Sequence, residues 1–318
     1  MAGKGKYYES QFEEATIELL RESHWQYTFG DDIHRKYTDP LIEEDLRTFL
    51  AAQYKDKRLA ASEVDGIVAN LRNTGGQNDY YALQNTFLLY RDGYDFTYND
   101  GRGNPFRLQY IDFEHPDHNI FRCVNQFVME QGRENRRPDI LLFVNGIPVC
   151  IIELKNPTKQ NATIRDAHTQ ICTRYMRDIP ALLKYCALAV ISDGAKNELG
   201  TTYTPFEFFY EWKKIDNEDK AGKGLDTLRT LIRGALSPER ILEILRDYIY
   251  FPDPSKEDDM TEIVCRYPQF FATRKLRNHI LNHLRSVGGD GKGGTYFGAT
   301  GCGKTYTMLF LARQLALR

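Results

Sequence analysis

The sequence predicts an α/β protein, and three kinds of segment support that prediction. Short runs rich in β-branched and aromatic residues are typical of strands, and we expect them to form one sheet. A long segment, 163–185, lies before the last run and has the length and one-sided polarity of a helix that joins neighbouring strands. Amphipathic patterns near the N-terminus predict helices before the sheet. The predicted strands are 107–113, 119–129, 139–144, 148–154 and 185–192, and the predicted early helices are 10–23, 42–54 and 62–73.

Length and composition predict a folded cytoplasmic protein. The chain has 318 residues, enough for about two domains. Hydrophobic residues make up 42% and charged residues 27%, which is typical of soluble globular proteins. No apolar run is long enough for a membrane span, and the first residues lack the apolar core of a secretory signal. The six cysteines are scattered singly, without zinc-ligand spacing.

Two adjacent predicted strands carry the candidate site. Asp139 opens the first strand, a turn follows at 145–146, and Glu153 and Lys155 close the second strand. With a two-residue turn alone, Asp139 would face Ile152, and Glu153 would point to the other side of the sheet. A three-residue loop or one bulge would instead place Asp139 opposite Glu153, with Lys155 on the same face. We predict this second register.

Two carboxylates and a lysine on one face suit phosphodiester hydrolysis. Asp139 and Glu153 offer the oxygen ligands that Mg²⁺ prefers, and the ion would stabilise charge and help to ionise water. Lys155 would orient or help to deprotonate the attacking water and offset charge on the phosphate. The alternative is structural, with Asp139 ending a turn and the other two residues at a solvated strand edge. The apolar strands and their joining turn favour a PD-(D/E)xK nuclease motif.

The string RPDILLFVNGIPVCIIELKNP resembles the nuclease motif in the restriction (R) subunit of type I restriction-modification enzymes. The resemblance implies a PD-(D/E)xK fold, a mixed sheet flanked by helices, with Asp139, Glu153 and Lys155 catalytic and the two carboxylates as metal ligands. It also implies Mg²⁺-dependent cleavage of double-stranded DNA in a complex with modification and specificity subunits. Downstream, 192–202 and 206–213 resemble the family's next strand and its Trp-ended segment.

Two helices are implied to complete the site. In the segment FEEATIELL, Glu13 best fits an acidic residue that can complete the metal site, with Glu14 as the alternative. An ordinary solvated carboxylate explains either residue equally well. Related nucleases carry Gln-x-x-x-Tyr on the helix after the motif, and Gln170 fits its first position. Tyr175 lies one residue too late, about 100° further round an α-helix, where Arg174 would be the neighbour of Gln170. We predict Gln170 as a supporting residue and leave Tyr175 or Arg174 open.

A second motif lies near the end of the chain, in TYFGATGCGKTYTMLFLARQLALR. After a strand-like entry, Gly-x-x-x-x-Gly-Lys-Thr leads into a helical pattern, the context of a Walker A phosphate loop. Its backbone N–H groups would hold phosphates, Lys304 would reach the β- and γ-phosphates of ATP, and Thr305 would bind Mg²⁺. Upstream, 266–280 resembles the family's adenine-reading Q motif, although a helix-capping Gln is the alternative. The predicted nucleotide-binding residues are Gly298, Thr300, Gly301, Gly303, Lys304, Thr305 and Gln269.

Charged stretches at 213–224 and 251–260 bracket a helical pattern and place a domain change between about 215 and 260. We predict an endonuclease domain at 1–235, with a helical N-terminal part and a nuclease core of about 105–215. The opening of a RecA-like helicase motor would follow at 236–318. The chain ends one helix after the phosphate loop, so a Walker B carboxylate and the remaining motor motifs are expected only in a longer subunit. No function is predicted for residues 30–105.

The net charge of -2 gives no general sign of nucleic-acid binding, because that affinity comes from Lys and Arg. Two other functions remain open. One is a degenerate nuclease fold that only binds DNA within a P-loop ATPase or helicase, and the other is a subunit-docking module at 1–105. A separate subunit reads DNA in the family, so the recognition sequence is not predicted. Positive charge gathers locally at Arg133, Arg136, Arg137, Lys155, Lys159, Arg174 and Arg177.

Overall fold

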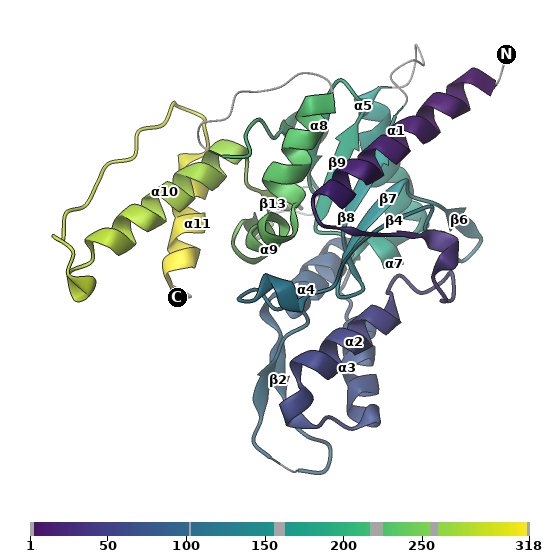
Figure 1. Cartoon of the computed structure of the whole chain (residues 1–318), viewed down its shortest axis with the longest axis horizontal. Coiled ribbons are helices and arrows are strands. Elements are labelled where there is room, and N and C mark those ends of the chain that lie inside the picture. Colours follow the sequence, from purple (N-terminus) through teal and green to yellow (C-terminus); the bar gives the residue numbers. More distant parts are fainter. Residues whose placement is uncertain (1–2, 102, 156–162, 217–224, 255–259, 317–318) are drawn as a thin grey trace.

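A seven-stranded mixed sheet forms the centre of the protein (Figure 1). The structure is a computed structural model that describes residues 3–101, 103–155, 163–216, 225–254 and 260–316, with side chains from Ser10 onwards. β1 pairs with β4, and β8 with β9, in parallel, whereas the other neighbours are antiparallel. The predicted α/β class with a mixed sheet flanked by helices is confirmed. The strand order is β1 (Gln26–Phe29), β4 (Phe121–Asn125), β7 (Ile140–Val144), β8 (Ile147–Leu154), β9 (Leu188–Ser192), β10 (Asn197–Gly200) and β11 (Tyr210–Glu211).

The central strands β7, β8 and β9 are buried along their whole length. Such strands read as continuous apolar runs because both faces of the sheet are covered. Alternation along β7 sends Leu142 into the core on one face, and Leu141 and Phe143 into the core on the other. The sheet therefore lies between two hydrophobic layers.

Helices cover both faces. The predicted crossover helix is confirmed between the parallel strands β8 and β9, and its apolar residues Ile164 and Ile171 pack on one face. It comprises α5 (Ile164–Thr169), a π-helical turn (Gln170–Tyr175), α6 (Met176–Asp178) and α7 (Pro180–Leu183). The other face packs on α1 (Gly3–Glu22), α8 (Leu225–Leu231), a second π-helical turn (Ile232–Leu236) and α9 (Pro238–Asp247).

A helical lobe extends below the sheet in Figure 1 and holds the predicted early helices 42–54 and 62–73. It contains α2 (Glu43–Gln53), α3 (Ala61–Asn73), α4 (Asp79–Asp92) and a small sheet of β2 (Tyr94–Phe96) and β3 (Phe106–Leu108). The expectation that 107–113 joins the main sheet was wrong. Its first residues form β3, because the nearby antiparallel partner β2 satisfies their backbone groups.

The predicted strand 119–129 is also divided. β4 ends at Asn125, and Gln126 follows with a φ of 55°, which an extended strand cannot continue. Met129 begins a separate hairpin of β5 (Met129–Gln131) and β6 (Glu134–Arg136).

The edge strand β1 was not predicted, since its sequence QYTF has little apolar alternation and three of its four residues are exposed. Single turns of 3-10 helix lie at Gly30–Asp32, Lys55–Lys57, Pro116–His118, Phe206–Phe208 and Arg285–Val287.

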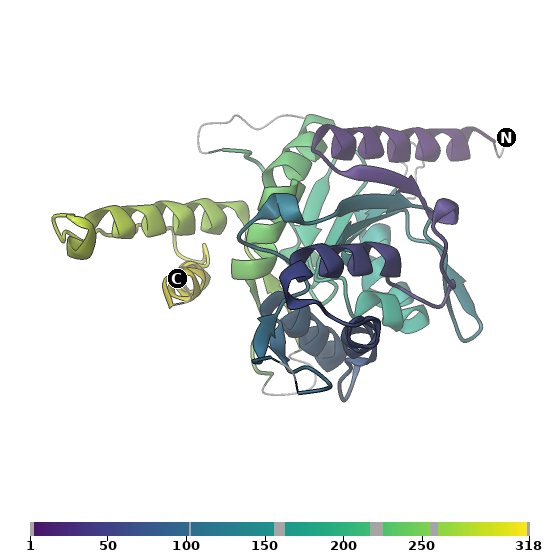
Figure 2. The same cartoon turned by 60° about the horizontal axis from the view of Figure 1, so that its bottom comes forward.

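The C-terminal segment contains β12 (Ile249–Tyr250), β13 (Ile263–Val264), α10 (Tyr267–His283) and α11 (Lys304–Ala316). α10 projects from the body with α11 beside it (Figure 2). One hydrophobic core runs from α1 to Phe270 and Phe310, so packing is continuous across residue 235, and the division there stays a prediction. In the part of the chain that the structure describes, no helix has the length and apolarity needed to cross a membrane.

Candidate active site

The hairpin of β7 and β8 has the register that the sequence predicted on the side of the candidate site. Ile140 pairs with Ile152, and Leu142 with Cys150, so the next positions outward would pair Asp139 with Glu153. The register shifts by one between Leu142 and Phe143, through a bulge in β8 rather than a longer turn. Asn145 and Gly146 have φ values of 52° and 75°, as expected for a two-residue hairpin turn.

Asp139, Glu153 and Lys155 gather where β7 begins and β8 ends. Glu153 is 1% exposed, and its Oε1 accepts a hydrogen bond from Lys155 Nζ at 2.7 Å. The carboxylate of Asp139 accepts the backbone N–H of Leu154 at 2.7 Å. Burial, and then repulsion by Asp139, raises the pKa of Glu153 to about 8, against the attraction of Lys155. A buried carboxyl thus lies beside a second carboxylate on the face that Lys155 shares.

The helix after β8 adds Gln170 and Tyr175 to this cluster. Gln170 accepts a hydrogen bond from Lys155 Nζ at 2.8 Å and donates one to the Tyr175 hydroxyl at 2.7 Å. The Tyr175 hydroxyl in turn donates to Glu153 Oε2 at 3.3 Å. Residues Gln170–Tyr175 form a π-helical turn, in which residues five apart lie on one face. The expectation that Arg174 is the neighbour of Gln170 was therefore wrong, since it assumed α-helical geometry, and Arg174 is exposed.

Glu13 of α1 faces the same end of the sheet. Its carboxylate accepts hydrogen bonds from Asn125 Nδ2 at 2.7 Å and from Gln126 Nε2 at 3.0 Å. The backbone N–H of Gln126 donates to the carbonyl oxygen of Asp139 at 3.4 Å, which joins this contact to the candidate site. Glu14 is exposed. Asn125 and Gln126 were missed from the sequence, where only the interruption of the predicted strand 119–129 by two adjacent amide side chains could have drawn attention to them.

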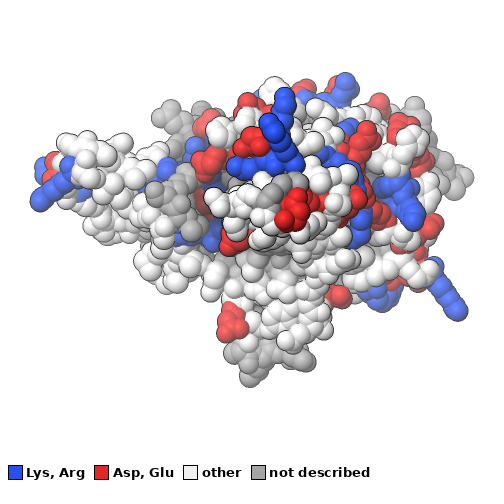
Figure 3. Space-filling model, turned by 90° about the horizontal axis from the view of Figure 1, so that it is seen from below, with Lys and Arg blue, Asp and Glu red and all other residues white. Residues whose placement is uncertain are grey.

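The positive charge that the sequence gathers between Arg133 and Arg177 is partly neutralised by acidic side chains. Arg136 and Arg177 both pair with the buried Asp178, at 2.7 and 2.6 Å. Lys159 lies outside the described residues. On the face shown in Figure 3, basic and acidic side chains are interspersed rather than gathered into one basic area.

The phosphate-loop motif leads into the N-terminus of α11. Lys304 Nζ donates to the carbonyl oxygens of Gly298 and Ala299, both at 2.9 Å. Gly301 and Gly303 have φ values of 79° and 80°, a conformation that favours glycine. Thr300 and Thr305 are exposed beside them.

The expected strand ahead of this loop is missing, since 292–299 form no strand in the part that the structure describes. A strand needs a hydrogen-bonded neighbour, and among the described residues none pairs with this segment. Gln269 on α10 is 5% exposed and lines a cavity of about 310 Å³ with Gly301 and Gly303. Its Oε1 accepts the backbone N–H of Arg266 at 2.8 Å, which is the helix-capping contact of the alternative interpretation. Gln269 therefore caps α10 and also adjoins the loop.

Comparison with known proteins identifies relatives. A family model described as the N terminus of type I restriction enzyme R proteins matches residues 6–208. The chain is 29% identical, over 319 residues, to the type I restriction enzyme HindI endonuclease subunit of Haemophilus influenzae, covering 96% of the chain and 30% of that protein. It is 27% identical, over 337 residues, to a protein of Methanocaldococcus jannaschii provisionally named type I restriction enzyme MjaIXP endonuclease subunit, covering 95% and 31%. The chain thus spans less than a third of either relative.

Proposed function

The chain belongs to the family of type I restriction enzyme R proteins, and on this premise we propose that it is the metal-dependent DNA nuclease region of such a subunit. One observation carries the proposal. Asp139, Glu153 and Lys155 share a face at the exit of β8, where Gln170 and Tyr175 complete one hydrogen-bonded cluster.

The two carboxylates suit a hard divalent cation. Burial and mutual repulsion disfavour the charged form of Glu153 beside Asp139, and a cation between them would relieve both effects. Mg²⁺ prefers oxygen ligands and keeps several waters when bound to one or two carboxylates. Bound Mg²⁺ would supply positive charge to the phosphodiester and lower the pKa of a water molecule. Asp139 and Glu153 would hold the ion, and Glu13 lies on the same side to assist through Asn125 and Gln126.

Lys155 is positioned for the substrate side of the reaction. Its ammonium group is held by Glu153 Oε1 and Gln170 Oε1, yet its side chain keeps 13% exposure. An ammonium has three donors, so one remains for a water molecule or a phosphate oxygen. Gln170 and Tyr175 fix the orientation of Lys155 and Glu153, which makes them positioning residues.

We further propose that the substrate is double-stranded DNA and that modification and specificity subunits bring it to the site. The chain has a net charge of -2, so most of the affinity for DNA would come from these partners. The loop from Gly298 to Thr305 would bind the phosphates of ATP at the N-terminus of α11, and Gln269 would contact the base. ATP-driven translocation would belong to the longer subunit, to which this chain contributes the phosphate loop.

The proposal is tested with a full-length R subunit carrying this chain, assembled with its modification and specificity subunits. Cleavage of a plasmid that bears the recognition site is followed with Mg²⁺ and ATP. Lys155→Ala should lower the cleavage rate about 100-fold or more, the loss typical of one group that stabilises transition-state charge, and should leave ATP hydrolysis unchanged. Lys55→Ala, at an exposed position in the helical lobe, is the matched control.

Two results would overturn the nuclease proposal. One is wild-type cleavage that persists undiminished in Lys155→Ala. The other is a wild-type complex that binds DNA and hydrolyses ATP but does not cleave, which would favour a degenerate nuclease fold used for binding alone.

A further inference from the structure

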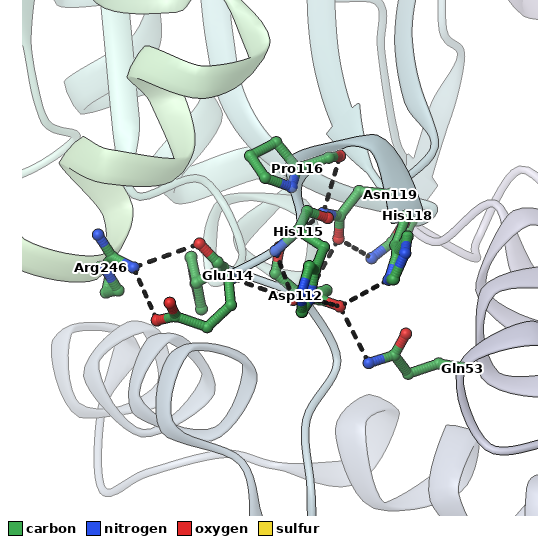
Figure 4. Close-up of polar contacts among 10 residues, drawn as sticks. Gln53, Asp112, Glu114, His115, Pro116, His118, Asn119 and Arg246 are labelled. Atoms are coloured by element: carbon green, nitrogen blue, oxygen red, sulfur yellow. Dashed lines mark hydrogen bonds and ion pairs between the residues drawn. The ribbon is translucent and has the colours of Figure 1, made fainter.

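Three potential metal ligands lie in the loop between β3 and β4. Asp112, His115 and His118 are spaced three residues apart, and the last of them ends a turn of 3-10 helix, Pro116–His118. His115 is the N-cap of this turn, and side chains three apart lie above one another in a 3-10 helix, whereas Asp112 is tied to the turn by accepting the backbone N–H of His115. Figure 4 shows Asp112, His115 and His118 close together in this loop. The spacing and the local fold therefore bring two imidazoles and a carboxylate together.

The distances between these groups suit a shared ion. Asp112 Oδ2 lies 3.0 Å from His118 Nδ1 and 3.4 Å from His115 Nδ1. Ligand atoms around a tetrahedral zinc ion are about 3.3 Å apart, because zinc binds nitrogen and oxygen at about 2.0–2.1 Å. The three ligand atoms all lie within 4.8 Å of one another, and the rings stack with centroids 4.8 Å apart. Both histidine side chains are at least half exposed, so small rotations can close the remaining gap.

Hydrogen bonds fix the orientation of the Asp112 carboxylate. It is 5% exposed, and its Oδ1 accepts the backbone N–H groups of Glu114 and His115 at 3.0 and 2.9 Å. Gln53 Nε2 donates to Oδ2 at 3.1 Å. Fixing a ligand through surrounding hydrogen bonds is typical of metal sites.

We propose that Asp112, His115 and His118 bind a divalent transition-metal ion of the Zn²⁺ type. Imidazole nitrogen with one carboxylate oxygen suits zinc, whereas Mg²⁺ prefers oxygen ligands alone. The site is separate from the nuclease centre. It lies just before Phe121, at one end of β4, whereas Asp139 directly precedes Ile140, which pairs with Asn125 at the other end of β4.

The contacts of the loop predict a structural role for the ion. On one side, Asn119 accepts a hydrogen bond from Asn145 Nδ2 in the hairpin turn at 2.8 Å. On the other side, Arg246 of α9 donates to Phe113 O and to Glu114 Oε1, both at 3.2 Å. Arg313 of α11 donates to Arg246 O at 2.9 Å. An ion that fixes the loop would therefore stabilise the packing of the turn between β7 and β8 against α9 and, through Arg246, against α11.

The proposal is tested by adding Zn²⁺ to the metal-free chain. The parent carries Glu153→Gln, so that the nuclease centre contributes little binding. Bound zinc is counted by equilibrium dialysis and elemental analysis, and the melting temperature is measured with Zn²⁺ and with EDTA. We expect one bound ion and a higher melting temperature in the parent. His118→Ala and His115→Ala should each weaken zinc binding at least about tenfold. In each variant the melting temperature with Zn²⁺ should equal that of the same variant in EDTA.

A second histidine pair provides the matched control. His279 and His283 of α10 stack with ring centroids 4.1 Å apart and could also attract zinc. The double variant His279→Ala/His283→Ala should bind zinc as the parent does. Zinc binding that is lost in this control but retained in His118→Ala overturns the proposal, as does equal binding by the parent and His118→Ala. If His118→Ala fails to fold, His115→Ala decides, because the side chain of His115 is 64% exposed.

Discussion

Gly146 in the turn between β7 and β8 is a position where one methyl group should destabilise the fold. Its φ is 75°, and a Cβ there would lie far inside contact distance of the carbonyl oxygen of Ile42. The two residues are already bonded, since Ile42 N donates to Gly146 O at 2.9 Å, directly before α2. Gly132, in the turn between β5 and β6, has a φ of 62° and open space around its Cβ position. Comparing Gly132→Ala with Gly146→Ala therefore separates the cost of the left-handed backbone conformation, which both share, from the cost of steric overlap, which only Gly146→Ala has.

Gly132→Ala should cost about 1–2 kcal/mol, the usual penalty of a left-handed conformation for an L-residue. Gly146→Ala carries the same penalty plus about 1–3 kcal/mol for forcing an atom into a packed region, hence about 2–5 kcal/mol in total. Urea denaturation followed by circular dichroism measures both, provided that the m-value is unchanged. Equal losses in the two variants would refute the reasoning, because the overlap with the start of α2 would then have no energetic effect.

Three further predictions follow from the structure. Tyr175→Phe removes the hydrogen bonds of the hydroxyl with Gln170 and Glu153 and should slow DNA cleavage about tenfold, which corresponds to roughly 1.4 kcal/mol. Arg174→Ala should not slow it, and equal effects of the two variants would contradict the π-helical placement. Burial raises the pKa of Glu243 from 4.5 to about 7, so the folded state keeps this proton longer and stability falls as pH rises between these values. Glu243→Gln should reduce this loss of unfolding free energy between pH 4.5 and 7 by at most about 3 kcal/mol, as measured by urea denaturation at each pH. The same pH dependence in the variant and the wild type would contradict the prediction. Lys304→Ala should weaken binding of a fluorescent ATP analogue at least about tenfold, whereas Lys292→Ala, at an exposed position, should not; unaltered binding in both would count against a phosphate loop.

The register of the β7–β8 hairpin shows how far sequence patterns reach. Period-two alternation, with charged residues at the strand ends, required one extra residue between Asp139 and Glu153. The pattern left open whether a turn or a bulge would supply it. The structure places it in β8, where both faces of the strand are buried, so the two-residue turn at Gly146 can still pack against the start of α2. The packing of α2, which is remote in sequence, is consistent with that choice.

The helix after β8 shows where an assumed geometry misleads. The sequence identifies Gln170 but, at 3.6 residues per turn, sends Tyr175 away from it. A π-helical turn restores the pair to one face, and both side chains reach the carboxylate and the lysine of the candidate site. Such turns are rare, so α-helical spacing is the default expectation from sequence. In the structure, Ile171 and Tyr175 of this turn pack in the core on one face of the sheet.

The sequence by itself determined the family, the α/β class and the central strands, because these depend on periodicity and on chemical groups at fixed spacing. It also predicted Asp139, Glu153, Lys155, Glu13 and Gln170 for the candidate site. Only the tertiary structure decided the position of the bulge, the π-helical turn, the edge strand β1, and the separation of β3 and β5 from the main sheet. It also brought Asn125 and Gln126 to Glu13 across more than a hundred residues. The physical reason is that hydrogen-bond partners and packing surfaces from distant segments select among local conformations of similar energy.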